Sequence, residues 1–153
     1  MKTQLQELLD RAQERYLTSQ DLKQFEDYVA SLPDRLALYR LLRDQEVALL
    51  QRVADQAEAE LKDAVGVETL EEGIKNLILV LRYGAMAMLL DDEGFLKQRL
   101  LSWLERVLPI QQMRQLNEML YRFLNQELKQ RLTPRQQTLL LPLITTAQVT
   151  LIY

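Results

Sequence analysis

Residues 69–90 read TLEEGIKNLILVLRYGAMAMLL and form a strongly apolar stretch. Thr69 and Glu72 have the spacing of a capping box, in which two side chains bond the free N–H groups at the start of a helix. The apolar residues that follow fall on more than one face of a helix, as is typical of a helix buried on several sides. We therefore expect the most buried helix of the protein here, with the other helices packed around it.

Similar signals divide the rest of the chain into helices. Thr18 with Asp21 and Thr133 with Gln136 repeat the capping spacing, and Pro33 predicts a break followed by a new helix. Residues 34–63 are long enough for two helices that meet near Asp44. Apolar stripes predict helices over residues 3–16, 18–32, 34–63, 69–90, 95–108, 109–128 and 133–153. With only four glycines and four prolines, the sequence predicts an all-α protein.

Two residue types are missing from the 153 residues, namely cysteine and histidine. Their absence excludes disulfides, thiolate nucleophiles, zinc–thiolate sites, histidine-ligated haem and histidine general bases. No Gly-rich phosphate loop or serine nucleophile elbow occurs. A dense group of carboxylates surrounds Gly66, and we interpret it as a hydrophilic surface rather than a catalytic site. We expect no enzymatic activity, no metal and no cofactor.

Charge is divided unevenly along the chain, whose net charge is −3. Residues 1–93 hold 11 Lys/Arg against 19 Asp/Glu, a net charge of −8, whereas residues 97–153 carry +5. We interpret the basic residues as a solvated face, with docking onto an acidic protein as the alternative and no nucleic-acid binding. No apolar run predicts a membrane span, and the sequence begins without a signal-peptide pattern. We therefore expect a cytoplasmic protein.

An amphipathic hairpin of two helices is predicted over residues 1–32, ahead of a main helical block over residues 33–153. Its apolar stripes need a cover, which is either the protein's own core or another chain. A Tyr16→Asp substitution is expected to disturb packing in both cases, because it would bury an unpaired charge. The residues that would form the contact are Leu8, Leu9, Tyr16, Leu17, Leu22 and Phe25.

Several short motifs occur in an order that resembles the phycobiliprotein family. Residues 12–18, AQERYLT, resemble the A-x-x-R-Y-L-S signature of its subunits, and residues 81–84, LRYG, resemble its L-x-T-Y-G segment. The resemblance covers nearly the whole chain. It implies a globin-like core of six helices preceded by a two-helix extension, which in phycobiliproteins packs two subunits together. By this resemblance, the hairpin residues would form a homodimer.

The departures from that family concern its pigment. By counting back from Tyr83, the cysteine that would carry a bilin falls at Leu70, and the Arg-Asp pair that would hold it falls at Glu72 and Gly73. The chain is therefore most similar to the bilin biosynthesis-associated globins. That resemblance implies a non-catalytic regulatory or scaffolding role, with bilin-biosynthesis enzymes or phycobilisome components as partners. Two alternatives stay open: a module that binds a bilin or other tetrapyrrole non-covalently, and a haem-free globin-type adaptor in stress signalling.

Overall fold

The computed structural model describes residues 4–108 and 110–153, with the side chains at 63 and 110–112 left out of the description. The predicted all-α class is confirmed, since the described residues contain helices and no strand. The helices are α1 Gln4–Glu14, α2 Ser19–Leu61, the short 3₁₀ turn η1 Lys62–Ala64, α3 Val67–Leu90, α4 Glu93–Leu96, the π turn η2 Lys97–Leu101, α5 Ser102–Val107, α6 Ile110–Arg131 and α7 Pro134–Ile152.

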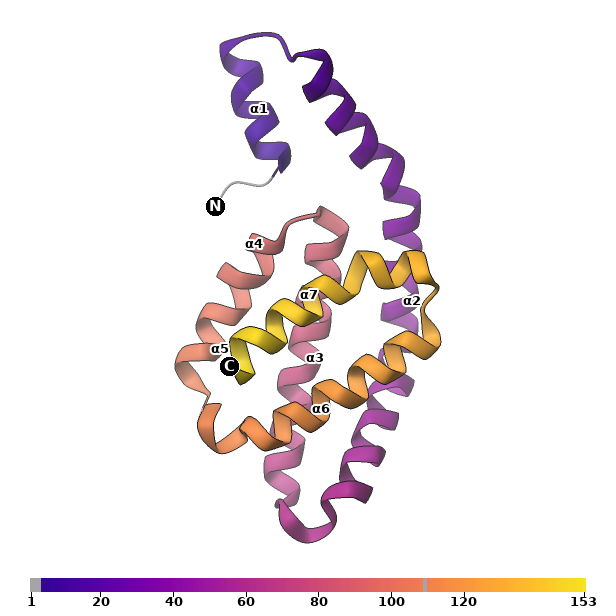
Figure 1. Ribbon diagram of the computed structural model, residues 1–153, viewed down its shortest axis with the longest axis vertical. Helices are drawn as coiled ribbons and strands as arrows, with labels where there is room; N and C mark the ends of the chain where they lie inside the picture. Colours follow the sequence, from indigo (N-terminus) through magenta and orange to yellow (C-terminus); the bar gives the residue numbers. More distant parts are fainter. Residues whose placement is uncertain (1–3, 109) are drawn as a thin grey trace.

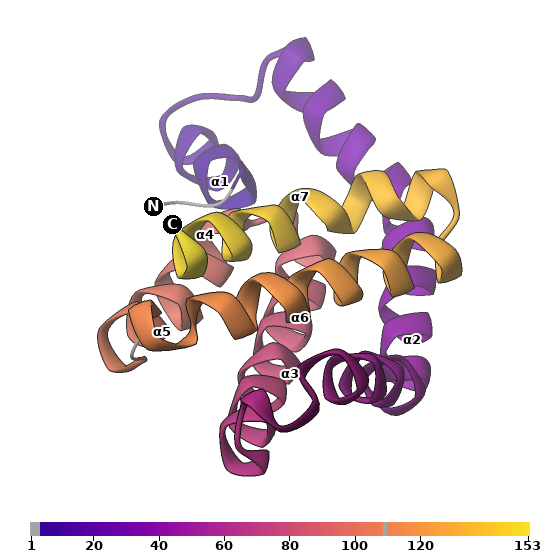
Figure 2. The same ribbon diagram turned by 60° about the horizontal axis from the view of Figure 1, so that its bottom comes forward.

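Helix α3 lies at the centre of the core, as predicted. Helices α6 and α7 run side by side across it, and α2 packs along another side (Figures 1 and 2). Leu77, Val80, Leu81 and Met88 of α3 are almost completely buried. By length and a mean hydropathy of 1.4, α3 alone among the described helices would be apolar enough to cross a membrane. Here α3 contacts four other helices, α2, α4, α6 and α7, so its composition is explained by core packing.

The start of α3 differs from the prediction. The helix begins at Val67, two residues earlier than expected, with Gly66 as its N-cap and without the predicted capping box of Thr69 and Glu72. Gly66 is exposed, so water can satisfy the first N–H groups and no side-chain cap is required. The C-terminus lies where it was expected: Asp91 adopts the left-handed conformation, with φ of 50°, and ends the helix.

Helix α2 contains the largest departure from the prediction. It runs without interruption over 43 residues, so the expected break at Pro33 and the expected junction near Asp44 are both wrong. A proline inside a helix removes one hydrogen bond and costs about 3 kcal/mol. Anchors on both sides of Pro33 hold the helix in place. The Tyr28 hydroxyl donates to the Leu89 carbonyl at 3.0 Å, and the Arg35 guanidinium donates to the Met88 carbonyl.

The remaining helices follow the sequence signals closely. Thr18 and Thr133 both form the predicted capping boxes, and Pro134 occupies the first turn of α7. The predicted helix over residues 95–108 is a continuous helical segment, Glu93–Val107. Its hydrogen-bonding pattern changes from α to π over η2 and back to α in α5. Pro109, expected to start α6, lies outside the described residues.

The first part of the chain extends beyond the packed body. Helix α1 and the start of α2 project from it as an N-terminal arm, which we define as residues 4–32 (Figure 1). The predicted hairpin boundary at residues 32 and 33 therefore falls inside α2, close to the contacts of Tyr28 and Arg35 with the end of α3. The division of a single cooperative domain into an extension over residues 1–32 and a core over residues 33–153 stays a prediction.

Candidate assembly surface and groove

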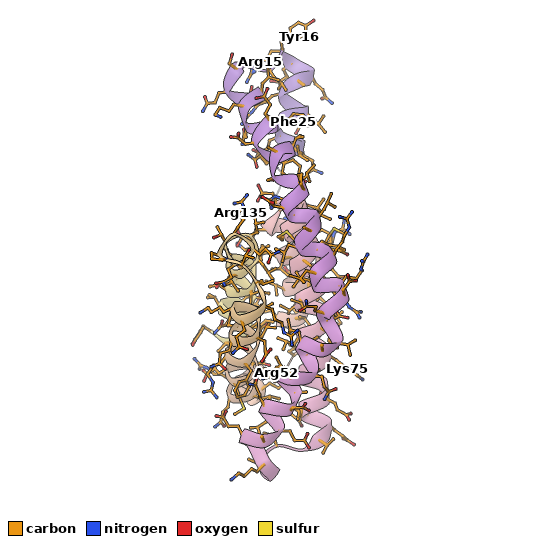
Figure 3. The ribbon with its side chains drawn as sticks, turned by 90° about the vertical axis from the view of Figure 1, so that its right-hand side faces the viewer. Arg15, Tyr16, Phe25, Arg52, Lys75 and Arg135 are labelled. Carbon is orange, nitrogen blue, oxygen red and sulfur yellow. The ribbon has the colours of Figure 1, made fainter. Side chains whose placement is uncertain are left out.

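The six residues expected to contact another chain all lie on the N-terminal arm. The side chain of Tyr16 is 98% exposed and that of Leu9 is 65% exposed, while Leu22 and Phe25 are 46% and 44% exposed. Tyr16 lies at the tip of the arm and Phe25 farther down the same projection (Figure 3). Leu17 is half-buried. Such a concentration of exposed apolar side chains on a projecting element is characteristic of a contact surface. We use the name arm surface for these six residues together with Val29 and Leu36, which are described below.

Leu8 differs from the other five because its side chain is only 4% exposed. It lies outside the main core cluster, so it is covered locally within the arm. In the single chain the side chain of Leu8 is therefore not available to a partner. It can contribute to the arm surface only by packing beneath the exposed residues around it. Its assignment to a contact between chains stays a prediction.

Asp21 fixes the turn between α1 and α2. Its carboxylate accepts hydrogen bonds from the Thr18 backbone N–H at 3.0 Å, from Arg15 at 3.1 Å and from Arg11 at 2.9 Å. The bond from Thr18, followed by that from Arg15, lowers the pKa of Asp21 to about 2. The carboxylate is thus charged at neutral pH, and it couples Arg11 of α1 and Arg15, just after α1, to the first turn of α2. The spacing of Thr18 and Asp21 predicts only a helix cap, whereas the i, i+4 spacing of Arg11 and Arg15 is the sequence signal for the second role of Asp21.

The arm surface continues farther along α2 than the sequence analysis expected. Val29 and Leu36 follow Leu22 at intervals of seven residues, and both side chains are exposed. This spacing places the three side chains on one face of the helix. The seven-residue spacing is visible in the sequence, but Val29 and Leu36 were not among the residues expected to form the contact.

A groove lies at the opposite end of α2, where the chain turns through η1 into α3. It encloses about 660 Å³ between the two helices and includes Leu70, the position at which the family pattern has its cysteine. Its apolar lining comes mainly from Leu61, Val65, Val67, Leu70 and Ile74, and its polar lining includes Asp55, Glu58 and Glu71. The structure therefore places a hollow where the resemblance implied a pigment site, without a residue that could attach the pigment.

Gly73 lies in a close contact between α3 and α6. A Cβ atom at this position would lie 2.9 Å from Leu120 Cδ1 and 3.1 Å from Leu116 Cδ2. Helix α6 thus occupies the space into which an aspartate side chain would have to extend. The position at which the resemblance predicted the bilin-holding aspartate is here a close contact between two helices.

Other chemistry finds little support in the structure. The described residues contain no cluster of three or more metal-ligating side chains. Met88 and Met113 are buried in the core. A buried carboxylate, Glu127, is held by Arg52 at 2.9 Å and Arg131 at 3.3 Å and joins α2 to α6. This triad contacts no cavity that the structure describes, so we interpret it as structural.

The sequence matches the model of a known protein family. Residues 9–148 match the family model described as Phycobilisome protein. The match includes nearly all of the arm and the helical body. None of the curated proteins compared with the chain matches its sequence.

Proposed function

Because this chain belongs to the phycobilisome protein family, we propose that it is a pigment-free, non-catalytic accessory protein that works through protein contacts in bilin biosynthesis or phycobilisome biogenesis. We place it in the cytoplasm. The observation that carries the proposal is the pairing of an exposed apolar arm with a pigment position that lacks cysteine. The means of assembly is retained while the means of pigment attachment is absent.

The arm is proposed to form a homodimer first. Phycobiliprotein subunits, which the chain resembles, pack together through the corresponding extension. Tyr16, Leu22 and Phe25 offer large apolar side chains of the kind that dominate contact energies. The ion pairs of Arg11 and Arg15 with Asp21 hold α1 against the start of α2 before a partner binds. This order lowers the conformational entropy that the arm loses on association. The same surface, or the body beside it, would then engage a pathway enzyme or an antenna component.

Affinity capture from a cyanobacterial lysate tests the role. The tagged full chain should recover bilin-pathway enzymes or antenna components, and a Tyr16→Asp/Phe25→Asp variant should recover less of them. Val47→Asp is the matched control, because Val47 is a highly exposed apolar residue of α2 outside the arm. Recovery of neither class by the wild-type chain in repeated experiments would overturn the proposal. Recovery of a sigma-factor regulator instead would favour the signalling adaptor.

The groove beside Leu70 favours a second candidate, non-covalent binding of a bilin or another tetrapyrrole. Its volume and apolar lining suit a planar apolar ligand, and Lys62 and Lys75 could contact propionate groups at the edge. Absorbance spectra of biliverdin and phycocyanobilin mixed with the protein test this function. A shifted and enhanced long-wavelength band is expected on binding, and it should weaken in Leu70→Lys. Unchanged spectra at saturating protein would exclude the second candidate.

A further inference from the structure

A second exposed surface lies on the turns from η2 to α5, at the edge of the body on the far side of α3 from α2 (Figures 1 and 2). Trp103 is 50% exposed and Val107 is 52% exposed, and they are one helical turn apart. Arg99 and Arg106 flank Trp103 at spacings of four and three residues, and both are exposed. We call these four residues the basic ridge.

The contacts of these turns with the core come from other residues. Leu100, Leu101 and Leu104 are almost completely buried and form the opposite side of the segment. Trp103 makes no ring contact and no hydrogen bond with the described residues. The exposed half of its side chain therefore has no polar or aromatic partner in that part of the chain.

The two arginines of the basic ridge have no carboxylate partner among the described residues. Arg99 is in no ion pair there, and Arg106 donates only to the backbone carbonyl of Ser102 at 3.2 Å. This sets them apart from most of the basic residues after position 96. Five of those eight residues pair with a carboxylate: Lys97, Arg114, Arg122, Arg131 and Arg135.

The two carboxylates between residues 93 and 107, Glu93 and Glu105, do not offset the charge of the ridge. Glu93 pairs with Lys97 at 3.4 Å. Glu105 is two residues from both Trp103 and Val107, so it lies on another side of the helix. The basic ridge therefore presents two positive charges beside an apolar centre, with no negative charge among its members.

We propose that the basic ridge binds an acidic amphipathic helix of another protein, with apolar side chains against Trp103 and Val107 and carboxylates against the two arginines. Charge complementarity carries this choice of partner, because guanidinium groups bind carboxylates in a defined and often bidentate geometry. Trp and Arg are also the residue types that contribute most to contacts between proteins. The proposal concerns a surface separate from the arm and does not depend on the arm dimer.

The spacing of the two arginines defines the partner further. Arg99 and Arg106 are seven residues apart, which is two helical turns or about 10 Å along the axis. Carboxylates at positions i and i+7 of a second helix have the same separation, and the residues at i+3 and i+4 lie between them on the same face. The expected partner segment therefore has acidic residues two turns apart with apolar residues between them.

An anionic lipid surface fits the same observations less well. Helices that lie on membranes combine a large apolar face with many basic residues. The basic ridge offers two of each over two turns. The first part of the chain, residues 1–93, carries a net charge of −8, which an extended anionic surface would repel. A single acidic helix contacts the ridge alone and avoids this repulsion.

The test uses Trp103 as its own reporter, because it is the only tryptophan of the chain. The full-length protein is titrated at about 50 mM salt with a helical peptide of about 20 residues, with Glu at i and i+7 and Leu at i+3 and i+4. We expect a saturable blue shift of the emission with a Kd below about 100 µM, since docking removes the indole from water. Raising the salt to about 0.5 M should weaken binding at least about fivefold.

Charge exchange identifies the ridge as the site. Arg99→Glu/Arg106→Glu should weaken binding of this peptide at least about tenfold. The same variant should bind a peptide with Lys in place of both Glu, which also shows that it is folded, whereas the wild type should not bind that peptide. Arg40→Glu/Lys129→Glu is the matched control. It makes the same change of charge at two exposed residues outside the ridge and should leave binding within about twofold of the wild type.

Three results would overturn the proposal: no saturable shift at up to about 1 mM peptide, equal binding by Arg99→Glu/Arg106→Glu, or equal binding of a peptide with the same composition whose two Glu lie on the opposite face. A shift with phosphatidylglycerol vesicles but not with the peptide would assign the ridge to lipid instead. A shift that grows with protein concentration alone would assign it to a second copy. None of these results affects the accessory function, which is judged by the partners captured through the arm.

Discussion

At Gly73, the position at which the family resemblance predicted a bilin-holding aspartate lies in the packed core. Helix α6 approaches α3 so closely there that even a methyl group would touch Leu116 and Leu120. The terminal methyl groups of leucine can move slightly, whereas a carboxylate would be buried without a partner. Position 73 should therefore tolerate a small side chain with a modest loss of stability and a charged side chain only with a large one.

Gly73→Asp is expected to lower the free energy of unfolding by at least about 3 kcal/mol, because it buries an unpaired charge. Gly73→Ala should cost less than about 2 kcal/mol, since the better helix propensity of alanine offsets part of the overpacking. Urea unfolding measures both. Gly66→Ala is the control for added volume: nothing lies within 4 Å of its Cβ position, so its cost should be limited to the poorer N-cap, about 1 kcal/mol or less. Equal stability of Gly73→Asp and wild type would contradict the close contact.

Asp21 makes the docking of α1 dependent on pH. Its pKa is about 2 in the folded chain against an ordinary value of 3.8, so the carboxylate stabilises the fold above about pH 4 and loses this contribution as the pH falls toward 2. Hydrogen exchange of the α1 amides, corrected for intrinsic rates, should therefore become faster over that interval. In Asp21→Asn exchange should already be fast at pH 6 and change little. Asp27→Asn, which removes only an exposed pair with Lys23, should behave like the wild type.

Helix α2 shows what the sequence could and could not predict about the elements. The capping box at Thr18 and the apolar periodicity were local signals, and both led to the correct structure. Pro33 is also a local signal, and it predicted a break. The helix continues because Tyr28 and Arg35 reach the last carbonyls of α3, residues more than fifty positions away. Such long-range anchoring leaves no trace in a single segment of sequence.

Pro33→Ala is expected to stabilise the root of the arm by about 1–3 kcal/mol. The change restores a backbone N–H within α2, while the greater freedom of the unfolded chain opposes part of the gain. Slower hydrogen exchange over residues 26–37 would register this effect. Pro134→Ala provides the comparison, because a proline in the first turn of a helix interrupts no hydrogen bond and its replacement should bring no gain. Faster exchange in Pro33→Ala would contradict the assigned cost.

At the scale of the whole molecule, the body could be predicted more fully than the surfaces. The central position of α3 followed from its apolar composition, and the family resemblance anticipated a globin-like arrangement. The exposure of Tyr16 could not be deduced, because an apolar stripe has the same pattern whether it faces a core or a partner. Nor could the groove, which depends on how α2 and α3 diverge after η1. The family pattern indicated only its position.

Tyr16→Asp separates packing within the chain from association between chains, two effects that the sequence alone did not distinguish. The expectation that it would disturb packing within the chain is wrong, because the side chain is 98% exposed and the new charge would lie in water. The thermal midpoint of the diluted, monomeric chain should stay within about 2 °C of the wild type. Sedimentation at tens of micromolar should show a loss of arm-mediated dimer. A wild-type chain without any arm-dependent association would refute the predicted homodimer.

Because α2 is one continuous helix, it fixes the distance between the arm surface and the groove. Its 43 residues have a contour of about 65 Å, with the arm surface near one end and the groove near the other. Two partners bound at these ends would be held at a set spacing and a set rotation about the helix axis. One residue inserted between them would lengthen this distance by about 1.5 Å but turn one partner by about 100° relative to the other. The phase of a single helix, more than its length, would then decide which larger architectures this chain can build.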